Sequence, residues 1–273
     1  MAESEIGSGV TMLARAGYAA RGVVYIIIGY FAVLAAWGGG GGQTTDSKGA
    51  LLSLLDEPFG TVLLGIVAVG LIGYALWRLI QGAMDTDGHG SDAKGLAIRG
   101  GLLISAVTHV LLAIFAFSLI FGWGSGGGGG GGGGTQDWTA WLMRQPYGRW
   151  LVALVGLAVL GAGIAHIVKG WKAKFEKYLR MDRQKLDTAR PICRFGLIAR
   201  GVVFLIIGAL FLVAAWQIDP SQAQGLAGAL QTLQEQAYGW VLLGVIALGL
   251  VAFGIYSLIE AIWRNIDHPF AEV

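Results

Sequence analysis

The chain has 273 residues, of which 55% are hydrophobic and 13% charged, and its mean hydropathy is +0.64. A soluble domain carries about 25% charged residues, so this composition excludes an ordinary water-soluble protein. The net charge of +2 is small, and we expect the lipid bilayer, rather than nucleic acid, to be the main partner. Cys193 is the single cysteine, which excludes an intramolecular disulfide and a CxxC redox or zinc motif.

Six apolar stretches are long enough to cross a membrane, because a helix needs about 20 residues to span the hydrocarbon layer. In chain order they are 17–37, 61–80, 100–123, 150–168, 201–218 and 240–259. The acidic start of the chain lacks the basic region and cleavage site of a signal peptide. We therefore interpret the first stretch as a retained span.

The sequence contains three copies of one two-helix unit. Residues 15–29 are repeated as 194–208, an offset of 179 that also relates Trp37 to Trp216. A more diverged middle copy begins near Arg99. The sequence thus predicts an all-α polytopic membrane protein with six transmembrane helices in three tandem helical hairpins, with repeat boundaries at 12–84, 95–176 and 189–264.

Each unit also has a short amphipathic segment between its two spans, at 50–55, 138–143 and 225–233. We expect extracytoplasmic helices that lie in the membrane interface, although ordinary loops with a few apolar anchors remain an alternative. The glycine-rich stretches 38–42 and 126–134 are interpreted as flexible linkers.

The basic residues predict the orientation of the chain in the membrane. Sixteen lysines and arginines lie on the side of the termini and the even connections, whereas three lie on the opposite side. Since basic connections stay in the cytoplasm, both termini are predicted to be cytoplasmic.

Arginine and glycine residues open the repeats, and aromatic-glycine motifs precede their second helices. These motifs are Arg15 with Gly17, Arg21 with Gly22, Arg99 with Gly101, Arg194 with Gly196, Arg200 with Gly201, Pro58-Phe-Gly60, Pro146-Tyr-Gly148 and the variant Ala237-Tyr-Gly239. Over residues 12–264 the chain resembles the DUF1206 family. The resemblance implies a bacterial inner-membrane protein of three two-helix repeats, and it brings no established activity or ligand.

The repeated arginines are the first candidate site, because arginine within a span is costly and often functional. They are Arg15, Arg21, Arg99, Arg194 and Arg200. Their alternative roles are anchoring at the membrane surface or binding an anionic ligand or lipid headgroup. The middle repeat has Ser105 where its partners have Arg21 and Arg200, which argues against a strict three-fold site.

The second candidate set comprises polar positions inside the bundle, namely Ser105, Thr108, His109, Lys169 and Glu260. His109 aligns with Tyr25 and Phe204, which favours a packing role. A haem site would require His109 and His166 to lie at the same depth in the membrane. A small hydrated pocket near Ser105 and Thr108 is an alternative. Lys169, Glu260 and Gln81 are equivalent positions, so we hypothesise a Lys169–Glu260 ion pair.

The function predicted from sequence is that of a non-enzymatic integral membrane component, either structural or an assembly partner, in the bacterial inner membrane. Other membrane proteins are candidate partners. The alternative is binding or passage of a small solute, ion or lipid through the bundle. All five prolines are predicted to lie outside the spans, and this disfavours the alternative because transporters often have membrane helices interrupted by glycine or proline. No catalytic residues, metal ligands or cofactors are predicted.

Overall fold

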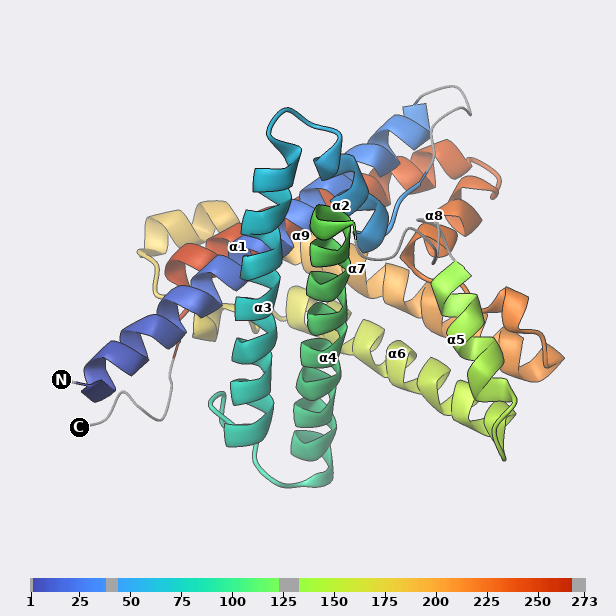
Figure 1. Ribbon diagram of the computed structural model, residues 1–273, viewed down its shortest axis with the longest axis horizontal. Coiled ribbons are helices and arrows are strands. Elements are labelled where there is room, and N and C mark those ends of the chain that lie inside the picture. Colours follow the sequence, from blue (N-terminus) through green and yellow to red (C-terminus); the bar gives the residue numbers. More distant parts are fainter. Residues whose placement is uncertain (1, 38–43, 123–132, 267–273) are drawn as a thin grey trace.

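A computed structural model describes residues 2–37, 44–122 and 133–266. Six helices in it are long and apolar enough to cross a membrane (Figure 1). They are α1 (Ala2–Trp37), α3 (Gly60–Met84), α4 (Ala93–Phe121), α6 (Gly148–Trp171), α7 (Arg183–Gln217) and α9 (Gly239–Trp263). The prediction of an all-α, six-span membrane protein is confirmed, and these helices place the chain in contact with a lipid bilayer.

Three short helices, α2 (Ser47–Leu55), α5 (Gly133–Met143) and α8 (Leu226–Gln234), occupy the amphipathic segments. Two 3₁₀ turns, η1 (Glu176–Tyr178) and η2 (Pro220–Gln222), lie in the connections. The apolar side of α2 and α8 does not face lipid as expected, because Leu51 and Leu230 are buried in the main core of the bundle. In α5, Trp138 and Trp141 are exposed, in agreement with an interfacial position. Most of the two glycine-rich stretches lies outside the described residues.

The aromatic-glycine motif has the same conformation in all three repeats. Phe59, Tyr147 and Tyr238 are left-handed, with φ of 61°, 60° and 59°. The glycine that follows each one starts the second membrane helix. A Cβ on Gly60 would lie 2.2 Å from the Leu55 carbonyl oxygen, so the motif allows a tight reversal between the short helix and the span. The same turn forms in the third repeat without the proline.

The membrane helices pack cyclically. The first helix of each repeat packs against the second helix of the preceding repeat, which gives the pairs α1–α9, α4–α3 and α7–α6. Within repeats, α1 packs on α3 and α7 packs on α9. Over the described residues, α4 and α6 make little or no contact with each other, and both are far less buried than the other four. The ring of helices is therefore open on the α4–α6 side, with the α3–α4 pair and the α6–α7 pair running in different directions (Figure 1).

Helix α7 extends well beyond its apolar stretch at its N-terminal end. It begins at Arg183 and contains Pro191, which still lies outside the predicted span 201–218. Pro191 precedes the apolar stretch 201–218, which explains why hydropathy alone placed it in a connection. All five prolines thus remain outside the six apolar stretches, which still disfavours passage through interrupted helices.

Candidate functional site

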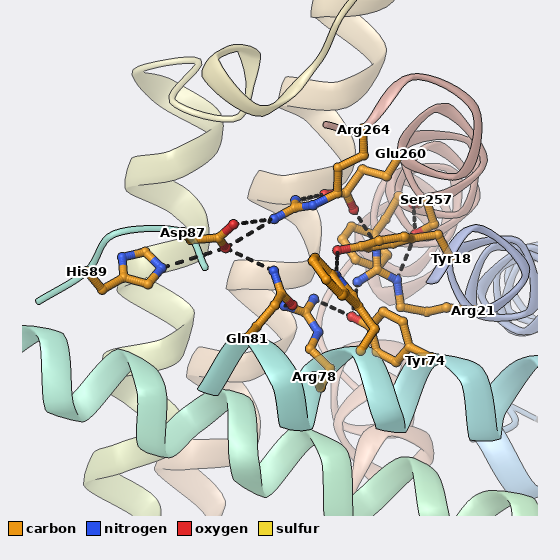
Figure 2. Close-up of polar contacts among 12 residues, drawn as sticks. Tyr18, Arg21, Tyr74, Arg78, Gln81, Asp87, His89, Ser257, Glu260 and Arg264 are labelled. Carbon is orange, nitrogen blue, oxygen red and sulfur yellow. Dashed lines mark hydrogen bonds and ion pairs between the residues drawn. The ribbon is translucent and has the colours of Figure 1, made fainter. Parts of the chain in front are cut away.

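The centre of the α1–α9 interface is a buried arginine with a full set of partners. Arg21 donates from Nε to Ser257 Oγ at 3.0 Å and from Nη2 to Glu260 Oε2 at 2.5 Å. Its remaining nitrogen donates to the Tyr74 hydroxyl. Arg21 and Glu260 are 4% and 2% exposed, so this is a desolvated ion pair that joins α1, α3 and α9 (Figure 2).

A second arginine extends this network to the connection after α3. Arg264 donates to Glu260 Oε1 at 2.6 Å and lies 3.1 Å from Asp87 Oδ2. Asp87 also accepts from Gln81 Nε2 at 2.9 Å. Each carboxylate thus accepts from two side chains, Glu260 from two arginines and Asp87 from Arg264 and Gln81. Hydrogen bonds between charged groups are stronger than those between neutral groups.

The connection itself is held by a carboxylate at the end of α3. Asp85 accepts from the backbone N–H groups of His89 and Gly90, both at 2.7 Å. These two backbone hydrogen bonds lower the pKa of Asp85 because they stabilise its ionised form. The turn fixes the position of Asp87, and His89 Nε2 lies 3.8 Å from it.

Arg78 borders the same network without a carboxylate partner of its own. It donates to Gln81 Oε1 at 3.1 Å and to the Tyr74 hydroxyl. Its Nε is buried and has no hydrogen-bond partner in the part of the chain that the structure describes. Its charge is therefore not neutralised locally.

Arg200 occupies the corresponding position in the α7–α6 interface, and its surroundings differ. Its guanidinium carbon lies 4.9 Å, 4.9 Å and 4.4 Å from the ring centres of Tyr25, Phe204 and Phe253. Within the described ranges it has no hydrogen bond and no ion pair, and its Nε is buried. Lys169 Nζ, on the adjacent helix, lies over the rings of Tyr178 and Tyr256, 5.6 Å from each centre.

The repeat alignment explains this difference residue by residue. Arg200 is equivalent to Arg21. The positions equivalent to the Arg21 partners Ser257, Glu260 and Tyr74 are occupied around Arg200 by His166 and Lys169 on α6 and Phe253 on α9. One of these replacements is cationic and another is apolar, so neither supplies a counterion or an acceptor.

Comparisons with known proteins agree with the repeat architecture. A family model described as a domain of unknown function, DUF1206, matches three times, at residues 16–85, 100–173 and 195–264. The chain belongs to the DUF1206 family. An uncharacterized protein of Bacillus subtilis (strain 168), YxxB, is 35% identical over 254 residues, which cover 92% of this chain and 90% of that protein. No solved structure matches.

In this DUF1206 protein, the other repeated arginines have separate environments. Arg99 donates to the carbonyl oxygens of Gly82 and Ala83, at 2.8 and 2.9 Å, and so caps the end of α3. Arg194 lies over the Trp171 ring at 5.9 Å. Arg15 is exposed and lines a half-open cleft of about 280 Å³ together with Arg180 and the end of α9. The five arginines therefore do not form one site.

The polar positions of the middle repeat pack against aromatic rings or bond to their own helix. The His109 ring lies 4.5 Å from the Tyr74 ring, and its Nδ1 is 2.7 Å from the carbonyl oxygen of Ser105. Thr108 donates to the carbonyl oxygen of Ile104 at 2.9 Å. No group of three metal-ligating side chains occurs among the described residues.

The hypothesised Lys169–Glu260 pair is wrong as an ion pair. Glu260 bonds to Arg21 and Arg264 instead, and Lys169 makes no ion pair in the described ranges. Lys169 Nζ does approach α9, at the Tyr256 ring, but Arg21 and Arg264 take both oxygens of the Glu260 carboxylate.

Several members of the network were missed by the sequence reasoning, namely Tyr74, Arg78, Asp87, Ser257 and Arg264. The signal that could have found two of them, Arg78 and Ser257, is the position that they share with His166, one turn before the position shared by Gln81, Lys169 and Glu260. It is polar in all three repeats.

Proposed function

We propose that this DUF1206 protein is a non-enzymatic membrane component that binds an anionic amphiphile from the bilayer, with its headgroup at Arg200. One observation carries the proposal. Arg21 has three acceptors, whereas the equivalent Arg200 has none among the described residues. The anion would take the place that the Glu260 carboxylate takes beside Arg21.

The energetics support a ligand at this position. An arginine inside a membrane costs about 2.5–3.5 kcal/mol on insertion scales, and such residues generally face a partner. Cation–π contacts with three rings each contribute about 0.5–2 kcal/mol, which offsets part of the desolvation. They satisfy the faces of the guanidinium but leave its N–H groups without acceptors, and buried donors without acceptors are themselves costly. An anion would supply both the charge and the acceptors.

The open side of the helix ring supports access from the lipid. Arg200 and Lys169 are both partly exposed, although they belong to the membrane helices α7 and α6. The helices that border the open side present large apolar side chains to their surroundings, including Ile104 and Leu111 on α4 and Leu154 on α6, which are 60–68% exposed. An acyl chain could lie along this side while the headgroup reaches Arg200.

Lipid retention by the purified protein tests this proposal. Wild type would be incubated with vesicles of phosphatidylglycerol and phosphatidylcholine, and bound lipid would be counted by native mass spectrometry. We expect phosphatidylglycerol to be retained by wild type and lost in Arg200→Gln. Arg194→Gln, on the same helix, is the matched control and should retain it. Equal retention by Arg200→Gln and Arg194→Gln would contradict the proposal.

A structural or assembly role is the second candidate, favoured by the low burial of α4 and α6. A partner membrane protein that covered these two helices would bury their apolar side chains. Its binding would rely on that exposed face rather than on Arg200, so it should survive Arg200→Gln. If Arg200→Gln lost bound lipid but still formed the same cross-links to neighbouring membrane proteins, the two roles would be shown to be separate.

We also propose that the protein lies in a bacterial inner membrane with both termini in the cytoplasm, on the basis of the 16 to 3 partition of basic residues. Cys193 is fully buried and cannot report orientation. In a Cys193→Ser background, Lys185→Cys should react with an impermeant maleimide only after permeabilisation, whereas Glu57→Cys should react in intact cells. The reverse pattern would show the opposite orientation.

A further inference from the structure

The polar centre of the bundle contains more positive charge than its carboxylates neutralise. Five cations, from Arg21, Arg78, Lys169, Arg200 and Arg264, surround two carboxylates, from Asp87 and Glu260. The carboxylates are paired with Arg21 and Arg264. Three positive charges, on Arg78, Lys169 and Arg200, are therefore in excess of the carboxylates and make no ion pair among the residues that the structure describes.

These three charges come from three different helices, α3, α6 and α7. They belong to one cluster, because neighbouring cations share aromatic rings. Arg78 and Arg21 lie over the Tyr74 ring, Arg200 and Arg21 over the Phe253 ring, and Lys169 and Arg264 over the Tyr178 ring. All three side chains are partly exposed. Such a concentration of like charge in a low-dielectric surrounding is repulsive unless an anion is present.

From this imbalance we infer that the ligand is a lipid that ends in a phosphate monoester, with close to two negative charges, rather than a phosphodiester lipid with one. The inference rests on the proposed function, because it names the headgroup that the Arg200 site takes. A phosphate monoester carries about −1.5 to −2 charge at neutral pH and offers three terminal oxygens. These oxygens can accept from Arg200, which favours bidentate contact with phosphate, and from Lys169, which acts as a point charge.

The shape of the Arg200 surroundings agrees with this headgroup. The rings of Tyr25, Phe204 and Phe253 lie around the guanidinium within 4.9 Å. Phe204 and Phe253 carry no polar group and Tyr25 carries a single hydroxyl, so the rings offer few hydrogen-bond partners to a polar alcohol such as glycerol. A terminal phosphate needs only the N–H edge of Arg200 and the ammonium of Lys169, so it fits the chemistry on this side better than a substituted phosphate does.

Competition between two lipids with identical acyl chains tests the inference. Dioleoyl phosphatidic acid and dioleoyl phosphatidylglycerol would be offered in phosphatidylcholine nanodiscs, and binding would be measured by native mass spectrometry. We expect phosphatidic acid to bind at least about tenfold more tightly than phosphatidylglycerol, and inorganic phosphate not to displace it. The comparison cancels the contribution of the acyl chains, so it reports the headgroup charge.

A matched pair of variants locates the preference in the site. Lys169→Gln should reduce the preference for phosphatidic acid to less than about threefold while phosphatidylglycerol still binds, because one of the unmatched charges is removed. Lys172→Gln removes the same charge from an exposed position close by and should leave the preference unchanged.

The outcomes separate this inference from the proposed function. Equal binding of the two acidic lipids by wild type would overturn the monoester assignment and leave the lipid-binding proposal standing. Loss of both acidic lipids to the level of phosphatidylcholine would overturn both. Displacement of phosphatidic acid by inorganic phosphate would show that the site takes free phosphate, and this would overturn the lipid assignment.

Discussion

The α1–α9 and α7–α6 interfaces have the same backbone packing. At the first, a Cβ on Gly22 would lie 3.0 Å from the carbonyl oxygen of Gly254. At the second, a Cβ on the equivalent Gly201 would lie 2.8 Å from the carbonyl oxygen of Gly163. Small residues allow both helix pairs to approach closely, as is usual between membrane helices.

The polar residues at the two interfaces differ. The first brings a carboxylate to its arginine through Glu260, and a second carboxylate follows through Asp87. At the second interface, Lys169 replaces Glu260, and Ile266 stands at the position equivalent to Asp87. The duplicated unit has thus kept its packing while one interface became a closed ion-pair network and the other a cation-rich site.

The largest expected effect comes from breaking the closed network. Glu260→Gln leaves the buried charges of Arg21 and Arg264 without their shared carboxylate. Because loss of one partner from a buried pair leaves an uncompensated charge, we expect the free energy of unfolding in detergent micelles to fall by about 3–5 kcal/mol. Thermal unfolding monitored by circular dichroism would measure the change.

The control for this prediction is the same substitution in an exposed pair. Glu176 bonds to Arg190, and the two side chains are 25% and 38% exposed. Glu176→Gln should cost at most about 1 kcal/mol. If the two variants lost the same stability, the network around Arg21 would not hold α1 to α9.

The shared packing predicts equal effects at the two interfaces from a second pair of variants. Gly22→Ala and Gly201→Ala each place a methyl group against a neighbouring backbone and side chain, with Leu258 at 2.8 Å and Ile167 at 2.6 Å. Overpacking of this kind costs about 1–3 kcal/mol. Unfolding midpoints of the two variants should fall by similar amounts, and a large effect at only one site would show that the interfaces do not pack alike.

A smaller effect is expected from making the open interface resemble the closed one. Lys169→Glu places a carboxylate at the position equivalent to Glu260, within the same helix pairing as Arg200. We expect stability to rise by about 1 kcal/mol relative to Lys169→Gln, since hydrogen bonds to charged groups contribute about 1.5–3 kcal/mol before desolvation is subtracted. Bound acidic lipid should be lost at the same time. A less stable Lys169→Glu that still retained lipid would refute the equivalence of the two sites.

The spans and the three repeats could be predicted because each depends on local pattern. Twenty apolar residues define a membrane helix wherever they occur, and the offset of 179 relates the outer repeats without a gap. The sequence also indicated that the positions of Arg21, Arg200 and Glu260 are unusual for a membrane interior.

The pairing of these residues could not be predicted, because it depends on which repeat lies beside which. With three copies, Glu260 had Lys169, Arg21 and Arg200 as candidate partners on charge alone. The cyclic order, with α9 against α1 and α6 against α7, decides between them. The open α4–α6 side could not be predicted from the sequence either, since α4 and α6 are as apolar as the equivalent helices of the other repeats.

The smallest expected effect concerns the turn that brings Asp87 into the closed network. Asp85 has φ of 52° and accepts two backbone N–H groups, which lower its pKa. Asn adopts left-handed φ readily, so Asp85→Asn removes the charge without straining the backbone. A lowered folded-state pKa stabilises the protein above the ordinary value of 3.8, and that contribution is lost as the pH falls through the folded-state pKa. Wild type should therefore unfold at a slightly higher temperature than Asp85→Asn at neutral pH, and the difference should disappear in strong acid. A difference that stayed constant with pH would mean that the carboxylate charge does not hold this turn.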